Sequence, residues 1–91
     1  MGHRQRERPK RLAEKLLQIR KTLGLSQRQL ARLIGITTGA GRISEWEHET
    51  REPDLLTVLR YARLAGVEME MLVDDDLELI IPEGKRQTTE L

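Results

Sequence analysis

Apolar residues recur at helical spacing in several short segments of the chain. The first such stripe has steps of four, three and four residues and consists of Leu12, Leu16, Ile19 and Leu23. Residues at these steps share one helix face. Pro9 suits the first turn of a helix, and Gly24 suits a left-handed helix end. The pattern therefore predicts a first helix that begins near Pro9 and ends at Gly24.

Two further short helices are expected before residue 50. Ser26 and Gln29 have the spacing of a capping box at the start of a helix. Gly35 would end that helix, whose apolar face contains Leu30, Ala31 and Ile34. In the next helix Ile43 and Trp46 lie three residues apart. This spacing favours Trp46 as a core residue over one that stacks on a base.

The apolar spacing in the second half of the chain predicts two more helices. One begins at Pro53 or Asp54 and stops at Gly66. Its buried side is expected to hold Leu56, Leu59, Ala62 and Ala65. Residues 67–73 predict a last short helix, with Met69 and Leu72 turned inward.

The apolar period changes after the three aspartates at 74–76. Residues 77–81 read LELII and alternate loosely at the spacing of a strand. Two interpretations stay open: an edge strand that pairs with a second copy, or a segment that packs over its own bundle. Residues 82–91 are polar and expected to be disordered. The expected fold is all-α: a five-helix bundle over residues 10–73, after a flexible basic arm (1–9) and before an acidic and apolar tail (74–91).

Composition narrows the classes of function. The chain has no cysteine, which excludes disulfides and thiolate metal sites and suits a reducing cytosol. Its two histidines, His3 and His48, are too few to assemble a metal site. No Ser-His-acid arrangement is recognisable, so neither an enzyme nor a cofactor is expected. No apolar run approaches the roughly 18 residues of a membrane span, and the N-terminus lacks the apolar segment of a signal peptide.

Charge is distributed unevenly along the chain. Residues 1–51 hold 12 Lys and Arg against 5 Asp and Glu, whereas residues 52–91 hold 4 against 10. The net charge of +1 hides this polarity. A chain of this kind presents its basic end to a polyanion. The distribution favours a nucleic acid or another anionic partner.

Gly39-Ala40-Gly41 raises the question of a phosphate-binding loop. A Walker loop needs a preceding strand and a Gly-Lys-Ser/Thr end, and a dinucleotide fingerprint needs a strand and three spaced glycines. Here a predicted helix precedes the glycines and Arg42 follows them, so nucleotide binding is not expected. Two short helices joined by a tight turn, the first ending in glycine, indicate a helix-turn-helix.

The segment from about residue 10 to 73 resembles the Cro- and lambda-repressor-like family, also called XRE regulators. The resemblance rests on LGLSQ at 23–27, Leu30-Ala31, Gly35-Ile36, Ile43-Ser44, Trp46-Glu47, Arg51-Glu52-Pro53 and Leu59, Ala62, Gly66-Val67. The turn before Ile43 is about two residues longer than is usual in the family. Its glycines suit close approach of the backbone to a phosphate, or simply a longer, flexible turn.

The resemblance implies which residues face DNA. In this family the third helix enters the major groove and the start of the second helix contacts the phosphate backbone. The candidates carried over to this chain are Gln27, Arg28, Thr37, Thr38, Gly39, Gly41, Arg42, Ser44, Glu45 and Arg51. Arg42 is expected to bind guanine O6 and N7, with a phosphate contact as its alternative. The family also implies an ion pair between Arg20 and Glu47.

Some of these candidates have second interpretations. Thr37 or Thr38 is expected to cap the third helix. Glu45 can accept from a cytosine amino group, face solvent or pair with Arg42, and the pairing is preferred. Gln27 can form a local hydrogen bond instead of a phosphate contact. The arm cations, Arg4, Arg6, Arg8, Lys10 and Arg11, either follow the DNA backbone or a minor groove, or form a solubilising tail.

The expected function is a cytoplasmic, nucleoid-associated regulator of transcription that binds double-stranded DNA. It would act as a repressor and bind a palindromic operator as a homodimer. One alternative is an antitoxin whose acidic C-terminal half binds a toxin or another protein. Another is a helical adaptor that does not bind DNA.

Overall fold

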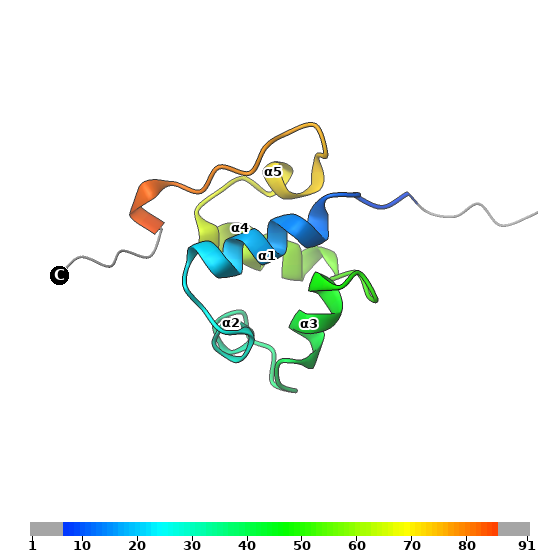
Figure 1. Cartoon of the computed structure of the whole chain (residues 1–91), viewed down its shortest axis with the longest axis vertical. Helices are drawn as coiled ribbons and strands as arrows, with labels where there is room; N and C mark the ends of the chain where they lie inside the picture. The colour runs from blue at the N-terminus through cyan, green and yellow to red at the C-terminus, as the bar shows by residue number, and fades with distance from the viewer. Residues whose placement is uncertain (1–6, 86–91) are drawn as a thin grey trace, which may run out of the picture.

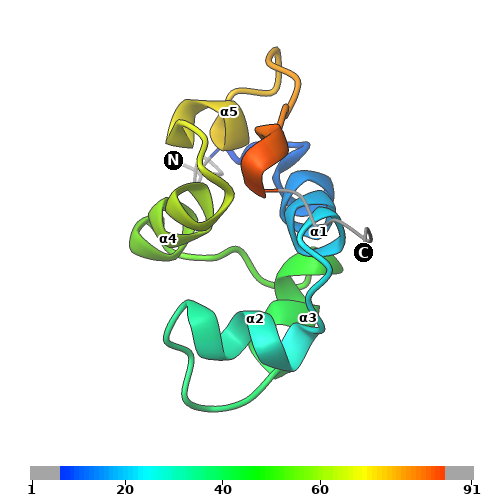
Figure 2. The same ribbon diagram turned by 90° about the vertical axis from the view of Figure 1, so that its left-hand side faces the viewer.

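Helix α1 (Leu12–Thr22) lies at the centre of the fold and contacts three other helices, α3 (Gly41–Glu47), α4 (Leu55–Ala65) and α5 (Met69–Val73). The computed structural model describes residues 7–85, and this part of the chain contains five α-helices and no strand. The remaining elements are α2 (Gln27–Leu33) and the 3-10 turn η1 (Glu83–Lys85). Figures 1 and 2 show α2 and α3 together at one end, and α5 with the C-terminal segment at the other. The predicted all-α fold is confirmed.

The core is built on the apolar stripe of α1. Leu16 and Ile19 are fully buried, and they belong to one apolar cluster to which every other helix contributes side chains. Trp46 is 5% exposed, and its ring meets that of Tyr61 edge to face, with centroids 6.2 Å apart and an interplanar angle of 69°. Aromatic pairs favour this geometry. The prediction that Trp46 belongs to the core is therefore confirmed.

Helix α1 begins later than the sequence predicted. Its first residue is Leu12, and Arg11 is the N-cap. The backbone N–H groups of Lys10 and Arg11 donate to the Asp75 carboxylate at 2.8 and 2.9 Å, which holds this part of the chain outside the helix. The C-terminal end is as predicted, because Gly24 adopts the left-handed conformation with φ 71°.

The buried face of α4 differs from the predicted one. Ala62 and Ala65 are buried as expected, but Leu56 is exposed and Leu59 only half-buried. Val58 and Tyr61 fill the core instead. The helix carries apolar residues almost all round, so their spacing did not single out one face. In α5 Leu72 is buried as predicted, whereas Met69 is half-buried.

Residues 77–81 form neither a helix nor a strand, and they pack over their own bundle. Leu79 and Ile81 are buried, whereas Ile80 between them is exposed. The strand-like alternation was thus a real signal of one buried side. Within this single chain the second interpretation holds, while pairing with a second copy stays a prediction.

Two polar side chains of α1 hold this C-terminal segment. Lys15 Nζ donates to the backbone carbonyls of Met71, Asp74 and Leu77 at 2.7, 2.9 and 2.8 Å. Gln18 donates to the carbonyl of Leu79 at 3.2 Å. Side chains three and four residues apart share a helix face, so both reach the same segment.

Arg11, the N-cap of α1, also contacts this segment. It forms ion pairs with Glu14 and Glu78 at 3.0 and 3.1 Å. The hydrogen bond from Arg11 holds the pKa of Glu78 below its ordinary value. In this structure Arg11 is therefore engaged within the fold rather than free on an arm. Disorder was predicted for residues 82–91, but residues 82–85 are described and include the 3-10 turn η1. Arg4, Arg6 and residues 86–91 lie outside the described residues. Within residues 7–85 no helix has the length and apolarity needed to span a bilayer.

Candidate nucleic-acid interface

Helix α2 and the turn after it are fixed by local hydrogen bonds. The predicted capping box is present: Ser26 Oγ accepts from Gln29 N–H at 3.0 Å, and Gln29 Oε1 accepts from Ser26 N–H at 2.8 Å. At the other end Gly35 takes a left-handed φ of 84°. Ile36 N–H then donates to Ala31 O at 2.8 Å, which directs the chain toward α3.

The two glycines of the turn have different roles. Gly39 has φ 102°, a conformation that side chains rarely adopt, whereas Gly41 has an ordinary backbone and begins α3. The backbone therefore requires glycine only at 39. No atom lies within 4 Å of a Cβ built on either residue, so both stand in open space.

The threonines before the turn do not cap α3. The N-cap is Ala40, without a side-chain hydrogen bond, and the prediction that Thr37 or Thr38 caps this helix is therefore wrong. Two residues, Gly39 and Ala40, separate them from the first turn. Both threonines are exposed and line a shallow hollow together with Arg42 and Arg51.

The inner side of α3 is tied to α1 and α2 through one carboxylate. Arg20 donates to Glu47 from Nε at 2.7 Å and from Nη2 at 3.0 Å, and Gln27 Nε2 donates to Glu47 at 3.0 Å. The predicted pair of Arg20 and Glu47 is confirmed. Gln27 follows its local alternative in this structure, and its contact with a phosphate stays a prediction.

The electrostatics of Glu47 follow from these contacts. Burial by itself would raise the pKa of this carboxyl, since its side chain is only 4% exposed. The hydrogen bonds from Arg20 and Gln27 outweigh that effect and hold the pKa of Glu47 below its ordinary value. The carboxylate is thus charged and joins three helices into one unit.

The outer side of α3 carries Arg42, Ser44 and Glu45. Arg42 is exposed, and its Nη1 lies 3.7 Å from Glu45 Oε1, so the preferred pairing of these two residues is confirmed. Ser44 is half-buried, and its hydroxyl lies 3.3 Å from His48 Nδ1. Nδ1 of the same imidazole lies 2.8 Å from the carbonyl of Ser44. This pair was not predicted, although its spacing of four residues places both side chains on one helix face.

A sharp turn after α3 returns Arg51 to the same surface. Glu49 has a left-handed φ of 62°, and Thr50 N–H donates to Glu45 O at 3.0 Å. Glu49 N–H donates to Trp46 O at 3.3 Å. These bonds form a Schellman motif, and Arg51 Nε then lies 3.2 Å from Glu45 Oε1. A glycine at 49 would have marked this turn in the sequence.

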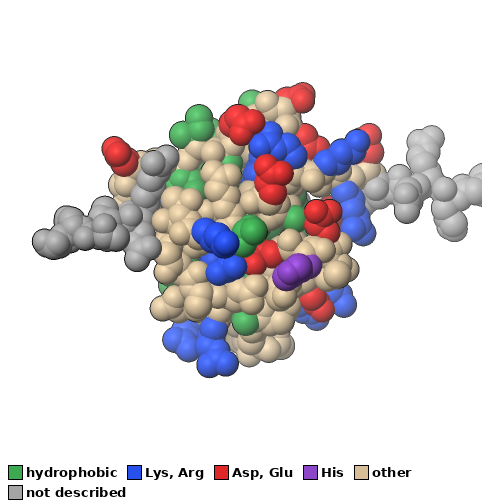
Figure 3. Space-filling model, in the orientation of Figure 1, with side chains coloured by type: hydrophobic (Ala, Val, Ile, Leu, Met, Phe, Trp, Pro, Cys, Tyr) green, Lys and Arg blue, Asp and Glu red, His purple; other side chains and the backbone are tan. Residues whose placement is uncertain are grey.

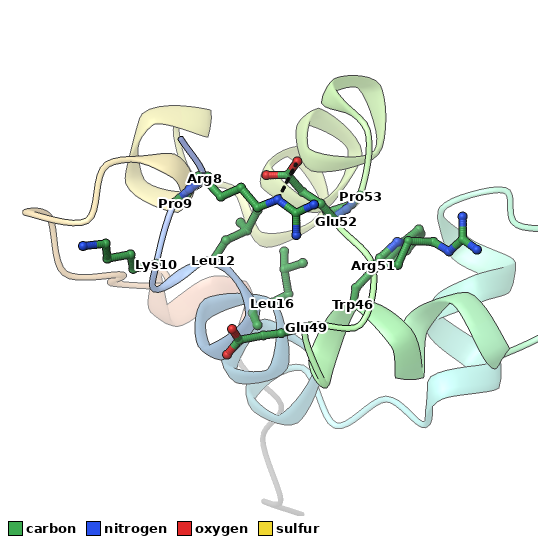
Figure 4. Close-up of a pocket in the computed structure, with 11 residues that line it drawn as sticks. Arg8, Pro9, Lys10, Leu12, Leu16, Trp46, Glu49, Arg51, Glu52 and Pro53 are labelled. Atoms are coloured by element: carbon green, nitrogen blue, oxygen red, sulfur yellow. Dashed lines mark ion pairs between the residues drawn. The ribbon is translucent and has the colours of Figure 1, made fainter. Parts of the chain in front are cut away.

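The loop after α3 also meets the segment before α1. Arg8 Nε lies 3.9 Å from Glu52 Oε1 across the mouth of a small hollow whose floor includes Leu12, Leu16 and Trp46 (Figure 4). In the same view Lys10 and Arg51 point away from the hollow. Of the described arm cations, Arg8 is thus held beside the loop that follows α3.

Exposed cations remain at the start and end of α2. Arg28 and Arg32 are exposed and form no ion pair with another described residue. Figure 3 shows basic side chains at the α2 end of the visible face, whereas toward α5 acidic side chains stand among further basic ones. Within residues 7–85 no group of His, Cys, Asp or Glu has the arrangement of a metal site. The exposed chemistry of this end suits an anionic partner.

Comparison with protein families gives one match. A family model described as a helix-turn-helix domain covers residues 13–76, from the second residue of α1 to beyond the end of α5. Comparisons with curated proteins and with solved structures gave no match.

Proposed function

Because the chain belongs to the helix-turn-helix domain family, whose model covers residues 13–76, we propose that it is a sequence-specific regulator of transcription. It binds double-stranded DNA through α2 and α3, in the cytoplasm with the nucleoid. The observation that carries this proposal is the arrangement of α3. Glu47 ties its inner side to Arg20 and Gln27, while Arg42 and Arg51 stand exposed on its outer surface.

The candidate residues differ in the contact that each makes with DNA. Arg42 near the start of α3 reads a base edge, because a guanidinium can donate two hydrogen bonds to guanine. Arg28 and Gln27 at the start of α2 contact phosphates, as does Arg51 in the turn after α3. The hydroxyl groups of Thr37, Thr38 and Ser44 form hydrogen bonds along the major groove. The absence of side chains at Gly39 and Gly41 lets the backbone approach the DNA closely.

A dimer follows from the size of the reading element. Helix α3 has 7 residues and is therefore about 10 Å long, which covers only a few base pairs. Two copies on a palindromic site would supply the missing specificity. Within residues 7–85 no separate effector domain is present, so we propose a repressor that acts by occupying its operator.

The acidic half gives weaker support to the antitoxin alternative. Asp75 and Glu78 are engaged by the segment that begins α1, so part of the acidic charge serves the fold. The adaptor alternative predicts that changes at Arg28 and Arg42 leave the function intact. Binding to DNA therefore separates it from the proposal.

We expect Arg51→Ala to weaken sequence-independent DNA binding and to flatten its salt dependence. Loss of one phosphate contact reduces the slope of log K against log salt by about one. The measurement is fluorescence anisotropy on a duplex of mixed sequence between about 50 and 200 mM salt. Arg63→Ala is the matched control, because Arg63 is exposed in the last turn of α4, outside α2 and α3, and should leave the slope unchanged. Equal slopes for wild type and Arg51→Ala would remove Arg51 from the interface.

A further inference from the structure

One carboxylate stands among the cations of the exposed α3 surface. Glu45 Oε1 lies 3.7 Å from Arg42 Nη1 and 3.2 Å from Arg51 Nε. This oxygen has almost no contact with solvent, whereas the side chains of Arg42 and Arg51 are 45% and 56% exposed. Glu45 thus faces two of the three cations that the proposed function assigns to DNA, Arg42 and Arg51.

The position of Glu45 is fixed by the backbone. Its carbonyl accepts from Thr50 N–H at 3.0 Å and from Thr50 Oγ1 at 3.2 Å. These bonds fold the left-handed turn at Glu49 back over α3 and bring Arg51 to the carboxylate. The cluster of two cations and one anion is therefore a feature of the folded helix end.

A phosphate and a base edge respond differently to such a cluster. A phosphate is negatively charged, so an arginine that turns toward it must leave Glu45 or bring the two anions together, which costs energy. Guanine O6 and N7 are neutral acceptors. Since a guanidinium has five N–H donors, Arg42 can donate two to guanine and keep others directed at Glu45. The carboxylate therefore opposes phosphate contacts more than base contacts.

We infer that Glu45 is a specificity-determining residue that suppresses binding to DNA of arbitrary sequence. By weakening phosphate contacts of Arg42 and Arg51, it raises the ratio of operator to non-operator affinity. The inference rests on the proposed function, because it requires α3 to face DNA. It assigns Glu45 a role through its two arginines and needs no contact between Glu45 and a base.

The test compares Glu45→Gln with the wild type on two duplexes, the site that the wild type selects from random sequence and a scrambled version of it. Glutamine keeps the size of the side chain and removes its charge. Affinity for the scrambled duplex is expected to rise about 2- to 5-fold, the size of a screened surface charge interaction. The slope of log K against log salt should steepen by about one. Affinity for the selected site should rise less, so the ratio falls.

Glu49→Gln is the matched control. It removes the same charge one turn away, and Glu49 is exposed and pairs with neither Arg42 nor Arg51. It should change both affinities by similar small factors and keep the ratio.

The remaining outcomes separate the inference from the function. An unchanged or higher ratio in Glu45→Gln, while the wild type selects a site, overturns the inference and leaves the function standing. Loss of affinity for the selected site alone would mean that Glu45 accepts from a base, which also overturns it. If the wild type binds neither duplex at low salt, the inference and the function both fail.

Discussion

Replacing Lys15 by methionine is expected to destabilise the fold by about 2–4 kcal/mol. Lys15 is fully buried, and its ammonium donates to the carbonyls of Met71, Asp74 and Leu77. Methionine fills a similar volume but donates no hydrogen bond. Removal of a buried charge can be harmless when its partners are removed too, but here three backbone carbonyls lose this donor, and of these Asp74 O still accepts from Leu77 N–H at 3.1 Å.

The free energy of unfolding in urea, followed by circular dichroism, measures this effect. Lys21→Met is the matched control, since Lys21 is exposed on the same helix and should change stability by less than about 0.5 kcal/mol. If Lys15→Met were as stable as the wild type, the ammonium would not be what holds the C-terminal segment on α1.

We expect Glu47→Gln to destabilise the fold by about 2 kcal/mol at neutral pH. The Arg20 side chain is only 16% exposed and would keep its charge without a counter-charge. Gln27 would also lose a charged acceptor. Because Glu47 joins α1, α2 and α3, the loss should loosen the helix-turn-helix itself.

The effect of Glu47→Gln should depend on pH in a defined direction. The pKa of Glu47 is lower in the folded state than its ordinary value of 4.5, so the folded state binds this proton more weakly than the unfolded state does. The stabilisation is therefore present above about pH 4.5 and is lost as the pH falls through the folded pKa. Unfolding free energies between pH 7 and pH 3 should show the difference between wild type and variant shrinking toward acid.

Glu68→Gln serves as the control for this pH series, because Glu68 is exposed at the start of α5. It should follow the wild type throughout. If the difference in unfolding free energy between wild type and Glu47→Gln stayed constant down to pH 3, protonation of Glu47 would not be the cause of the stability lost in acid.

Features encoded within a few residues could be predicted from the sequence. The Ser26 capping box and the helix end at Gly24 depend only on near neighbours, and both are present. The burial of Trp46 followed from its spacing to Ile43. The pair of Arg20 and Glu47 came from the family resemblance, because no spacing along the chain relates α1 to α3.

Features that depend on distant contacts could not be predicted. Lys15 lies between Leu12 and Leu16 on the apolar face of α1, and its burial requires carbonyls 56 to 62 residues away. The later start of α1 likewise depends on Asp75, which accepts from the backbone of Lys10 and Arg11 although it lies 64 to 65 residues further along the chain. The left-handed Glu49 has no glycine to mark it, so the return of Arg51 to Glu45 was invisible in the sequence.

The most direct test that the chain reads DNA is selection of bound sites from random duplexes, with the wild type beside Arg42→Ala and with Arg63→Ala as control. The wild type and the control should enrich one palindromic site. Arg42→Ala should lose that site or relax its preference at one position in each half, where guanine is read. No binding by the wild type at low salt would contradict DNA recognition. Selection of the same site with the same affinity by Arg42→Ala would contradict the assignment of Arg42 to the bases.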